Sequence, residues 1–543
     1  MTNASDIFVQ TLVAEGVQYI FGVPGEENLT FLESIRQSTI QFIPTRHEQA
    51  AGFMAATIGR LTGNPGVCLS TLGPGATNLM TAVAYAQLGA MPTLFITGQK
   101  PIKSSKQGHF QIINTVEMMR PLTKLSRQIV DANLIVSTVQ EAFKISRDER
   151  PGAVHLELPE DIAADLVPNP PVVTPLLTPR RPIAENKAIA QAIKLIESAK
   201  HPLLLIGAGA NRKRVSKMLN LFVDKTSIPF FTTQMGKGVI SENHPQYLGT
   251  AALSAADYLH EAVALADLII NVGHDTIEKP PFLMSQVNPQ TVLHLNFSPA
   301  IPDPIYRPQL EVIGDIANAI WQITEAITPS PAWDFSPFKQ QIDFIQASFT
   351  TTLDSGDPET LSPYHIIQSI RAELQNEDIV TLDNGMYKLW FARHYPAFSP
   401  NTLLLDNALA TMGAGLSSAM AAKLLNPDKT VVAVCGDGGF MMNSAELETA
   451  KRLGLDLVVI VLTDNTYGMI DWKQSGMQLP QFGLQFGNPD FVQYAQAYGV
   501  SGHQVNSSTE LSSVLKQSIA EGGIHLLSVP IDYSDNQYLG KKS

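Results

Sequence analysis

Two aspartates, each placed where a short apolar run ends, carry the clearest chemical signal in the sequence. Asp437 lies in the glycine-rich turn 436–439 after the run 431–435, and Asp464 follows the run 457–462. Glycine turns let backbone N–H groups approach a diphosphate closely, and carboxylates hold a hard divalent cation. If both runs are parallel strands of one sheet, the carboxylates meet at its carboxyl edge. The pattern predicts a site for a diphosphate and a magnesium ion.

Each aspartate taken alone has an ordinary explanation. A Gly-Asp-Gly segment is most often a simple turn, and an aspartate after a strand often caps a loop. The interval from Gly438 to Asp464 leaves room for one helix and one strand, which favours a joint role. Asn443, with Glu446 three residues later, predicts where that helix begins.

Glu48 is the candidate for acid–base chemistry. It follows Arg46 and His47 and begins a helical pattern rich in small and apolar residues. The field of a helix amino terminus also favours a glutamate with no catalytic role. The turns at 21–25 and 71–78, about one strand–helix unit on either side, favour the functional interpretation.

The elements that must position these residues follow an α/β pattern. Apolar runs alternate with helical patterns, which is typical of parallel sheets covered by helices. The runs lie at 66–70, 92–96, 203–206, 268–272, 292–295, 431–435, 457–462 and 526–529. Two proline-rich stretches, 167–182 and 328–337, are predicted linkers. We therefore expect three doubly wound parallel-sheet domains, at residues 1–166, 187–327 and 360–543.

Composition limits the possible partners. With 37 basic and 50 acidic residues the net charge is −13, which argues against nucleic acid or an anionic membrane as the main partner. Cys68 and Cys435 lie in separate apolar runs, so neither a disulfide framework nor a cysteine metal cluster is expected. The amino terminus shows a capped helix rather than a basic and apolar leader, so the expected location is the cytoplasm.

The motifs together resemble a known family. The segments Phe-Gly-Val-Pro-Gly at 21–25, Arg-His-Glu-Gln at 46–49 and Gly-Pro-Gly-Ala-Thr-Asn at 73–78 are similar to the thiamine-diphosphate-dependent acetolactate synthases. The resemblance covers nearly the whole chain. It implies pyrimidine-binding, central and diphosphate-binding domains, in that order. It also implies that Glu48 is catalytic, trading a proton with the cofactor's aminopyrimidine, and that two subunits share each active site in a homodimer or homotetramer.

The resemblance implies Asp437, Asp464 and the backbone carbonyl of Thr466 as the magnesium ligands. The family usually has Asn-Asn where this chain has Thr463-Asp464, so Asn465 stays open as an alternative ligand.

The resemblance further implies a set of cofactor-binding residues, including Met412, which props the cofactor into a bent form. Met412 also fits an ordinary core position. A departure is Tyr387, where the family usually has a histidine. The cofactor set is Glu48, Val23, Pro24, Gly25, Pro74, Asn78, Gly385, Ala410, Met412, Gly436, Asp437, Gly438, Gly439, Asp464, Thr466, Tyr467, Gly468, Met469 and Ile470.

Segments at 121–126, 444–450 and 532–536 resemble acetolactate synthases, the last two especially the catabolic branch, which does not use FAD. The glycine run 207–210 lacks the third glycine and the later acidic partner of a dinucleotide site, so FAD is not expected. Three residues are expected to contact substrate: Gln111, Trp472 and Lys473. Trp472 matches a phenylalanine of the catabolic branch, whereas Lys473 matches neither branch, so it could pair with an acceptor carboxylate or reach solvent.

The expected function is acetolactate synthesis. One pyruvate would be decarboxylated on thiamine diphosphate and the resulting enamine joined to a second pyruvate, giving 2-acetolactate and carbon dioxide. A 2-keto acid decarboxylase that releases an aldehyde is the enzymatic alternative. A catalytically silent regulatory subunit is the non-enzymatic one.

Overall fold

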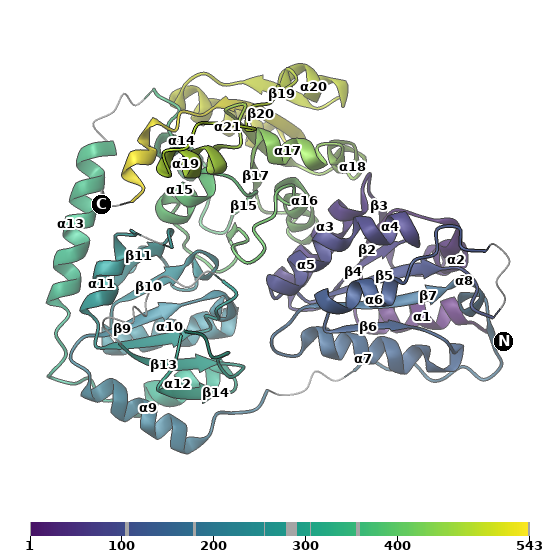
Figure 1. Ribbon diagram of the computed structural model, residues 1–543, viewed down its shortest axis with the longest axis horizontal. Helices are drawn as coiled ribbons and strands as arrows, with labels where there is room; N and C mark the ends of the chain where they lie inside the picture. Colours follow the sequence, from purple (N-terminus) through teal and green to yellow (C-terminus); the bar gives the residue numbers. More distant parts are fainter. Residues whose placement is uncertain are drawn as a thin grey trace. The chain divides into compact units, whose positions relative to one another are not determined.

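The computed structural model describes residues 2–103, 108–176, 181–254, 256–278, 290–304, 306–353 and 359–540, with only the backbone of residues 345–353. The chain divides into two compact units (Figure 1). The first unit comprises Met1–Pro179, Ala408–Pro427 and Phe440–Leu455, and the second comprises Arg180–Asn407, Asp428–Gly439 and Asp456–Ser543.

The first unit is built on one parallel sheet. Its strands are β2 (Tyr19–Gly22), β3 (Gln41–Pro44), β4 (Gly66–Ser70), β5 (Thr93–Gln99), β6 (Leu125–Gln128) and β7 (Ala153–Pro159), in the order β3-β2-β4-β5-β7-β6. Helices α1 (Ala4–Ala14), α2 (Leu29–Arg36) and α7 (Ile135–Arg147) cover one face. Helices α3 (Glu48–Thr62) and α5 (Met80–Leu88) cover the other (Figure 1). Glu48 is the first residue of α3, as predicted.

Segments from the carboxyl-terminal part of the chain belong to the first unit. Helix α16 (Gly415–Leu425) packs on α3, and Thr57 Oγ1 donates to Ser418 Oγ across 3.1 Å. Helix α18 (Glu446–Arg452) lies in the same unit. The predicted domain boundaries at residues 166, 187, 327 and 360 stay predictions.

The second unit contains two further six-stranded sheets. The middle sheet consists of β9 (Pro202–Ile206), β10 (Phe230–Thr233), β11 (Tyr247–Ala251), β12 (Leu268–Val272), β13 (Thr291–Asn296) and β14 (Leu310–Ile313), ordered β11-β10-β9-β12-β13-β14. The last sheet consists of β15 (Ile379–Leu382), β16 (Leu403–Leu404), β17 (Val431–Gly436), β18 (Leu457–Thr463), β19 (Ser501–Gln504) and β20 (Ile524–Pro530), ordered β16-β15-β17-β18-β20-β19. Every neighbouring pair in both sheets is parallel.

The sequence pattern explains why these strands form. Each predicted apolar run overlaps an observed strand, and central strands such as β9, β12 and β17 are apolar and buried along almost their whole length. Strands covered on both faces have no polar side to present to water, so they appear in sequence as continuous apolar runs. The predicted α/β fold with three doubly wound parallel sheets is confirmed.

The predicted helix start at Asn443 was wrong. Helix α17 (Asp437–Asn443) begins directly after β17, and Asp437 Oδ1 accepts from Gly438 N at 2.8 Å. The next helix, α18, begins at Glu446 with Ala445 as its N-cap. Asn443 lies at the end of α17, and its amide donates to Gly413 O and to Gln49 Oε1.

No helix within the described ranges has both the length and the apolar character needed to cross a membrane.

Candidate active site

The two aspartates identified from sequence lie together in the second unit. Strands β17 and β18 are neighbours, with Gly436 opposite Leu462, so both carboxyl ends reach the same sheet edge. Asp437 Oδ2 accepts from the backbone N–H of Asp464 at 3.2 Å and of Asn465 at 2.8 Å. The buried Asp437 carboxylate therefore fixes the loop that carries Asp464.

Asn488 belongs to this site and was not predicted. Its Nδ2 donates to Asp437 Oδ2 at 2.7 Å and to Asn465 Oδ1 at 2.8 Å. The local sequence, Gly-Asn-Pro at 487–489, says nothing of a partner 51 positions away. Asn488 ties the side chain of Asn465 to the carboxylate of Asp437.

Tyr387, the residue that departs from the family histidine, braces the glycine turn. It begins helix α15 (Tyr387–His394), is buried, and its hydroxyl accepts from Gly436 N at 2.9 Å. A Cβ on Gly385 would come within 2.4 Å of the Tyr387 ring, so the predicted glycine at 385 is required by this packing. Burial, followed by the charge of Asp383, raises the pKa of Tyr387 far above its ordinary value, so the hydroxyl stays protonated.

Close packing surrounds the remaining glycines of the turn. A Cβ on Gly439 would lie 2.6 Å from Asp383 Oδ2, and one on Gly438 would lie 3.1 Å from the Tyr467 ring. The rings of Tyr467 and Phe486 contact each other with centroids 4.9 Å apart. The backbone of the turn is thus enclosed by a carboxylate on one side and by aromatic rings on the other.

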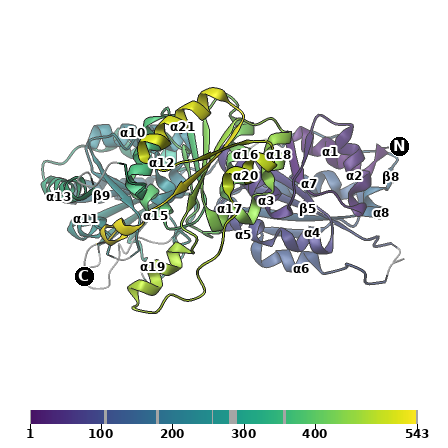
Figure 2. The ribbon, with the colours of Figure 1, turned by 90° about the horizontal axis from the view of Figure 1, so that it is seen from above.

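The predicted residues Gly468, Met469, Ile470, Trp472 and Lys473 lie on helix α19 (Gly468–Gly476). None of its residues is buried, and the helix lies at the edge of the second unit (Figure 2). The Lys473 ammonium lies over the Trp472 ring, 4.7 Å from its centroid. A Cβ on Gly468 would lie 2.9 Å from Asp464 Oδ2, so the start of α19 adjoins the Asp464 carboxylate.

The first unit gathers the amino-terminal set around Glu48. Asn78 Nδ2 donates to Glu48 Oε2 at 2.9 Å, and the Glu48 side chain is buried at the start of α3. Asn78 closes the short helix α4 (Gly73–Asn78), which also contains the predicted Pro74. Thr71 packs between the turns that carry Gly25 and Gly75, since a Cβ on either glycine would collide with it.

Glu446, expected from sequence to help start a helix, is the first residue of α18 and also binds the segment before Glu48. Its Oε1 accepts from Arg46 N at 2.9 Å and from His47 N at 3.0 Å. Thr449 Oγ1 donates to its other carboxylate oxygen at 2.7 Å, and burial raises the pKa of Glu446. The sequence could not reveal this role, because the bonded residues lie about 400 positions apart.

Three further predicted residues of the first unit lie in loops. Gln111 is exposed, has a φ of 58°, and its carbonyl lies 2.6 Å from where a Cβ on Gly73 would be. Ala410 has a φ of 56°, and Met412 is half-buried beside Gly413, which has a φ of 89°. Ala410 and Gly413 thus both adopt left-handed backbone conformations in the loop at 410–413.

Comparison with known proteins identifies the family. Models of the thiamine pyrophosphate enzyme match the chain in three parts: the N-terminal TPP binding domain at residues 2–118, the central domain at 189–323 and the C-terminal TPP binding domain at 383–529. The chain is 33% identical to the acetolactate synthase of Bacillus subtilis strain 168, over 98% of this chain and 94% of that protein. The chain belongs to the thiamine-diphosphate-dependent acetolactate synthase family.

Two other relatives show the same full-length similarity. The catabolic acetolactate synthase of Raoultella terrigena is 31% identical over 99% of this chain and 96% of that protein. A probable acetolactate synthase large subunit of Methanocaldococcus jannaschii is 31% identical over 98% of this chain and 92% of that protein. The protein is a thiamine-diphosphate-dependent enzyme that carries out carboligation.

The residues of this family member fit a divalent cation on the cofactor's diphosphate. Burial, followed by the charge of Asp437, raises the pKa of Asp464 to about 7. No ion pair between either carboxylate and a basic side chain is found in the described ranges, so a cation would supply the missing charge. The described residues contain no group of three His, Cys, Asp or Glu side chains suited to a metal.

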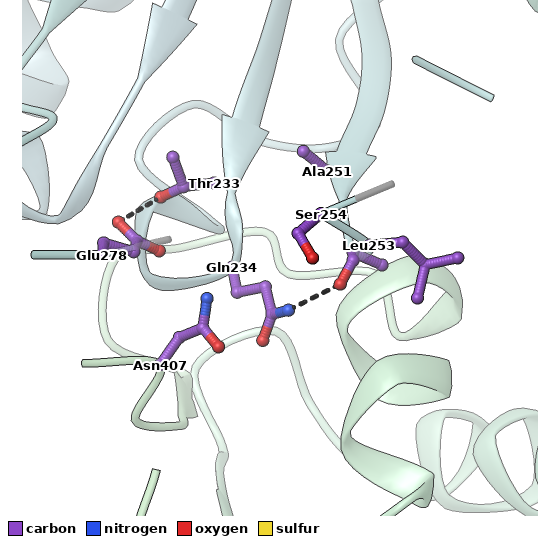
Figure 3. Close-up of a pocket in the computed structure, with 8 residues that line it drawn as sticks. Thr233, Gln234, Ala251, Leu253, Ser254, Glu278 and Asn407 are labelled. Carbon is purple, nitrogen blue, oxygen red and sulfur yellow. Dashed lines mark hydrogen bonds between the residues drawn. The ribbon is translucent and has the colours of Figure 1, made fainter. Parts of the chain in front are cut away.

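The middle sheet of this enzyme contains a small polar cavity (Figure 3). Its volume is about 20 Å³, enough for one water molecule, and Thr233, Gln234 and Glu278 are among the residues that line it. Glu278 accepts from Thr233 Oγ1 at 2.7 Å and from Met235 N at 2.9 Å. The absence of FAD stays a prediction.

Proposed function

We propose that the protein is an acetolactate synthase that converts two molecules of pyruvate into 2-acetolactate and carbon dioxide. The observation that carries the proposal is the buried Glu48 carboxylate, held by Asn78 in a chain that also keeps the Asp437–Asp464 pair. A regulatory homologue without activity has no chemical reason to retain all three acidic groups. The names of the relatives support the same activity.

Glu48 is proposed to exchange a proton with the cofactor's aminopyrimidine. Its position at the amino terminus of α3 and the hydrogen bond from Asn78 fix the carboxylate in one orientation. When bound, thiamine diphosphate supplies a carbon nucleophile for the keto carbon of the substrate. The chain's part is to move this proton, orient the reactants and exclude water.

Asp437, Asp464 and the carbonyl of Thr466 are proposed to hold Mg²⁺ on the diphosphate. The two carboxylates supply the hard oxygen ligands that Mg²⁺ prefers. Asp464 rather than Asn465 is favoured, because the Asn465 side-chain oxygen already accepts from Asn488.

The remaining cofactor assignments are part of the same proposal. Val23, Pro24, Gly25, Pro74 and Asn78 are proposed to line the pyrimidine. The proposed diphosphate side consists of Gly385, Ala410, Met412, Gly436, Gly438, Gly439, Tyr467, Gly468, Met469 and Ile470.

Substrate contacts are proposed for Gln111, Trp472 and Lys473. The Lys473 ammonium is exposed and provides a positive charge for the carboxylate of an acceptor 2-keto acid. Pyruvate is the proposed substrate in both roles. The proposed assembly is a homodimer or homotetramer in the cytoplasm, with two chains sharing each active site.

One experiment separates acetolactate synthesis from the alternatives. The purified protein is supplied with Mg²⁺, thiamine diphosphate and pyruvate, and acetolactate and acetaldehyde are both quantified. Acetolactate as the main product is expected. Mainly acetaldehyde would identify a decarboxylase, and no consumption of pyruvate would identify a silent subunit.

Glu48→Gln tests the role of the carboxylate. We expect at least a hundred-fold loss of turnover with cofactor binding retained, because the amide keeps the shape but cannot exchange the proton. Glu33→Gln is the matched control, since Glu33 lies exposed on α2 of the same unit and pairs only with its neighbours Arg36 and Gln37. Full activity of Glu48→Gln would remove the assignment.

A further inference from the structure

A buried ion pair lies in the first unit at the carboxyl edge of its sheet. Lys100 Nζ and Glu27 Oε1 are 2.6 Å apart, and the two side chains are only 8% and 4% exposed. Lys100 directly follows β5, and Glu27 lies in the short helix η1 (Glu26–Asn28). No motif singled out in the sequence includes this pair.

Both members of the pair carry charge at neutral pH. Burial acts to raise the pKa of Glu27, but hydrogen bonds from Lys100 and Thr71 outweigh it and the pKa lies below its ordinary value. The pKa of Lys100 is raised, first by its hydrogen bond to Glu27. The free-energy cost of removing two charges from water is about as large as the free energy gained from their attraction. A contribution to stability therefore does not by itself explain this buried pair.

Thr71 links the ion pair to the cofactor-binding turns. Its hydroxyl donates to Glu27 Oε2 at 2.5 Å, so the carboxylate is bound by Lys100 on one oxygen and by Thr71 on the other. A Cβ on Gly25 would lie 2.3 Å from Thr71 Cβ, and a Cβ on Gly75 would lie 2.9 Å from Thr71 Cγ2. Thr71 is therefore wedged between the two turns predicted to bind the pyrimidine.

The same contacts extend to the catalytic glutamate. A Cβ on Gly75 would also lie 3.3 Å from Glu48 Oε1, so this turn touches the carboxylate. Gly75 belongs to α4, the helix whose last residue, Asn78, donates to the other oxygen of Glu48. Moving Thr71 would shift both contacts of the carboxylate.

The pair is anchored to the sheet as well as to the turns. A Cβ on Gly98, in β5, would lie 3.1 Å from the Glu27 Cβ and 2.8 Å from Asn28 Nδ2, so η1 lies flat against the strand end. The network thus connects the end of β5 to the Gly25 turn and to helix α4, which contacts Glu48.

We propose that Glu27 and Lys100, acting through Thr71, are positioning residues that hold the Glu48 carboxylate and its turns in register with the cofactor's aminopyrimidine. The inference rests on the proposed role of Glu48 and goes beyond it, because it assigns a function to residues that do not contact the reacting atoms. A displacement of about 1 Å at a catalytic group can cost roughly a hundred-fold in rate.

Two substitutions separate positioning from folding. Thr71→Val keeps the shape of the side chain and removes the hydroxyl that binds Glu27. The double variant Glu27→Met/Lys100→Met replaces the ion pair by apolar groups of similar size, a change that is often neutral or stabilising. Lys103→Met is the matched control, because it breaks the exposed Lys103–Asp165 pair in the same unit.

The measurements use the holoenzyme with Mg²⁺ and thiamine diphosphate and without substrate. The exchange rate of the thiazolium C2 proton with deuterium is followed by quench and NMR, and cofactor affinity by calorimetry. We expect exchange at least ten-fold slower in Thr71→Val and in the double variant, with Kd for the cofactor within three-fold of wild type. The thermal midpoint of the double variant should not fall, and Thr71→Ser should restore exchange to within three-fold.

A C2-proton exchange rate in Thr71→Val within two-fold of the wild-type rate would overturn the inference. If the double variant does not fold, the result for Thr71→Val is sufficient by itself. Failure of Thr71→Ser to restore exchange would also overturn it, because the hydroxyl would then not be the operative group. Wild-type exchange no faster than that of free cofactor, or normal exchange in Glu48→Gln, would instead remove the proposed function itself.

Discussion

Glu278 makes the stability of the second unit depend on pH. Its carboxylate lines the cavity beside the middle sheet, and burial raises its pKa from 4.5 to about 7 despite hydrogen bonds from Met235 N and Thr233 Oγ1. A group with a raised pKa in the folded state favours folding while it is protonated. Its contribution is complete below about pH 4.5 and is lost as the pH rises through about 7.

The size of the effect follows from the shift. Each pKa unit corresponds to about 1.4 kcal/mol, so ionising Glu278 in place costs about 3 kcal/mol. Glu278→Gln cannot ionise, and its amide can satisfy Met235 N and Thr233 Oγ1 as the protonated acid does. The variant should match wild type at pH 5 and be more stable by up to about 3 kcal/mol at pH 8.5.

Thermal unfolding of wild type and Glu278→Gln at several pH values tests this. For a domain of about 150 residues, 3 kcal/mol corresponds to roughly 6–12 °C. Glu325→Gln, at an exposed position of α12 (Ile316–Ala326), controls for the loss of one charge. The thermal midpoint of the variant is compared with that of wild type at each pH. Asp464, whose pKa is also raised, makes the stability of both proteins fall with rising pH, and this comparison cancels its contribution. A difference that stays constant from pH 5 to pH 8.5 would refute the reasoning.

Three further substitutions probe the carboxyl-terminal site. Tyr387→Phe leaves the Gly436 N–H without its acceptor and should lower the free energy of unfolding, measured by denaturant titration, by about 1–3 kcal/mol. An unchanged denaturation midpoint would show that water replaces the hydroxyl. Asn488→Ala removes a hydrogen bond to Asp437, a proposed metal ligand, and should weaken Mg²⁺-dependent cofactor binding about 10-fold or more by calorimetry. Unchanged affinity would contradict this. Lys473→Gln should raise KM for pyruvate about ten-fold at unchanged thermal midpoint, and an unchanged KM would place the ammonium outside the acceptor site.

The fold could be predicted from the sequence because its sheets are buried on both faces. Runs such as 431–435 and 457–462 are apolar at every position, as expected for strands buried on both faces. Because helical patterns separate these runs, a parallel sheet is the arrangement that the sequence predicts. The site at the end of β17 and β18 follows from that topology. The positions of motif residues next to strand ends, such as Asp437 and Asp464, can therefore be predicted from the sequence.

Contacts between distant segments could not be predicted in the same way. Glu446 was assigned to a local capping box, yet its carboxylate binds the backbone of Arg46 and His47. A capping motif depends only on spacing, whereas a buried carboxylate takes whichever N–H donors the tertiary fold brings to it. Glu27 and Lys100 were missed for the same reason, since neither occurs in a recognisable motif and their partnership exists only in three dimensions.

The choice between Asp464 and Asn465 shows how the structure narrows an ambiguity of sequence. Both residues follow the same strand, so spacing alone leaves either as the second metal ligand. In the structure the Asn465 amide oxygen accepts from Asn488, and its backbone adopts a φ of 56° that fits a tight turn. The Asp464 carboxylate instead accepts from Thr466 N at 3.3 Å, and burial, followed by the charge of Asp437, raises its pKa. A half-buried carboxylate with a like charge beside it is the group that gains most from a cation, which favours Asp464 as the ligand.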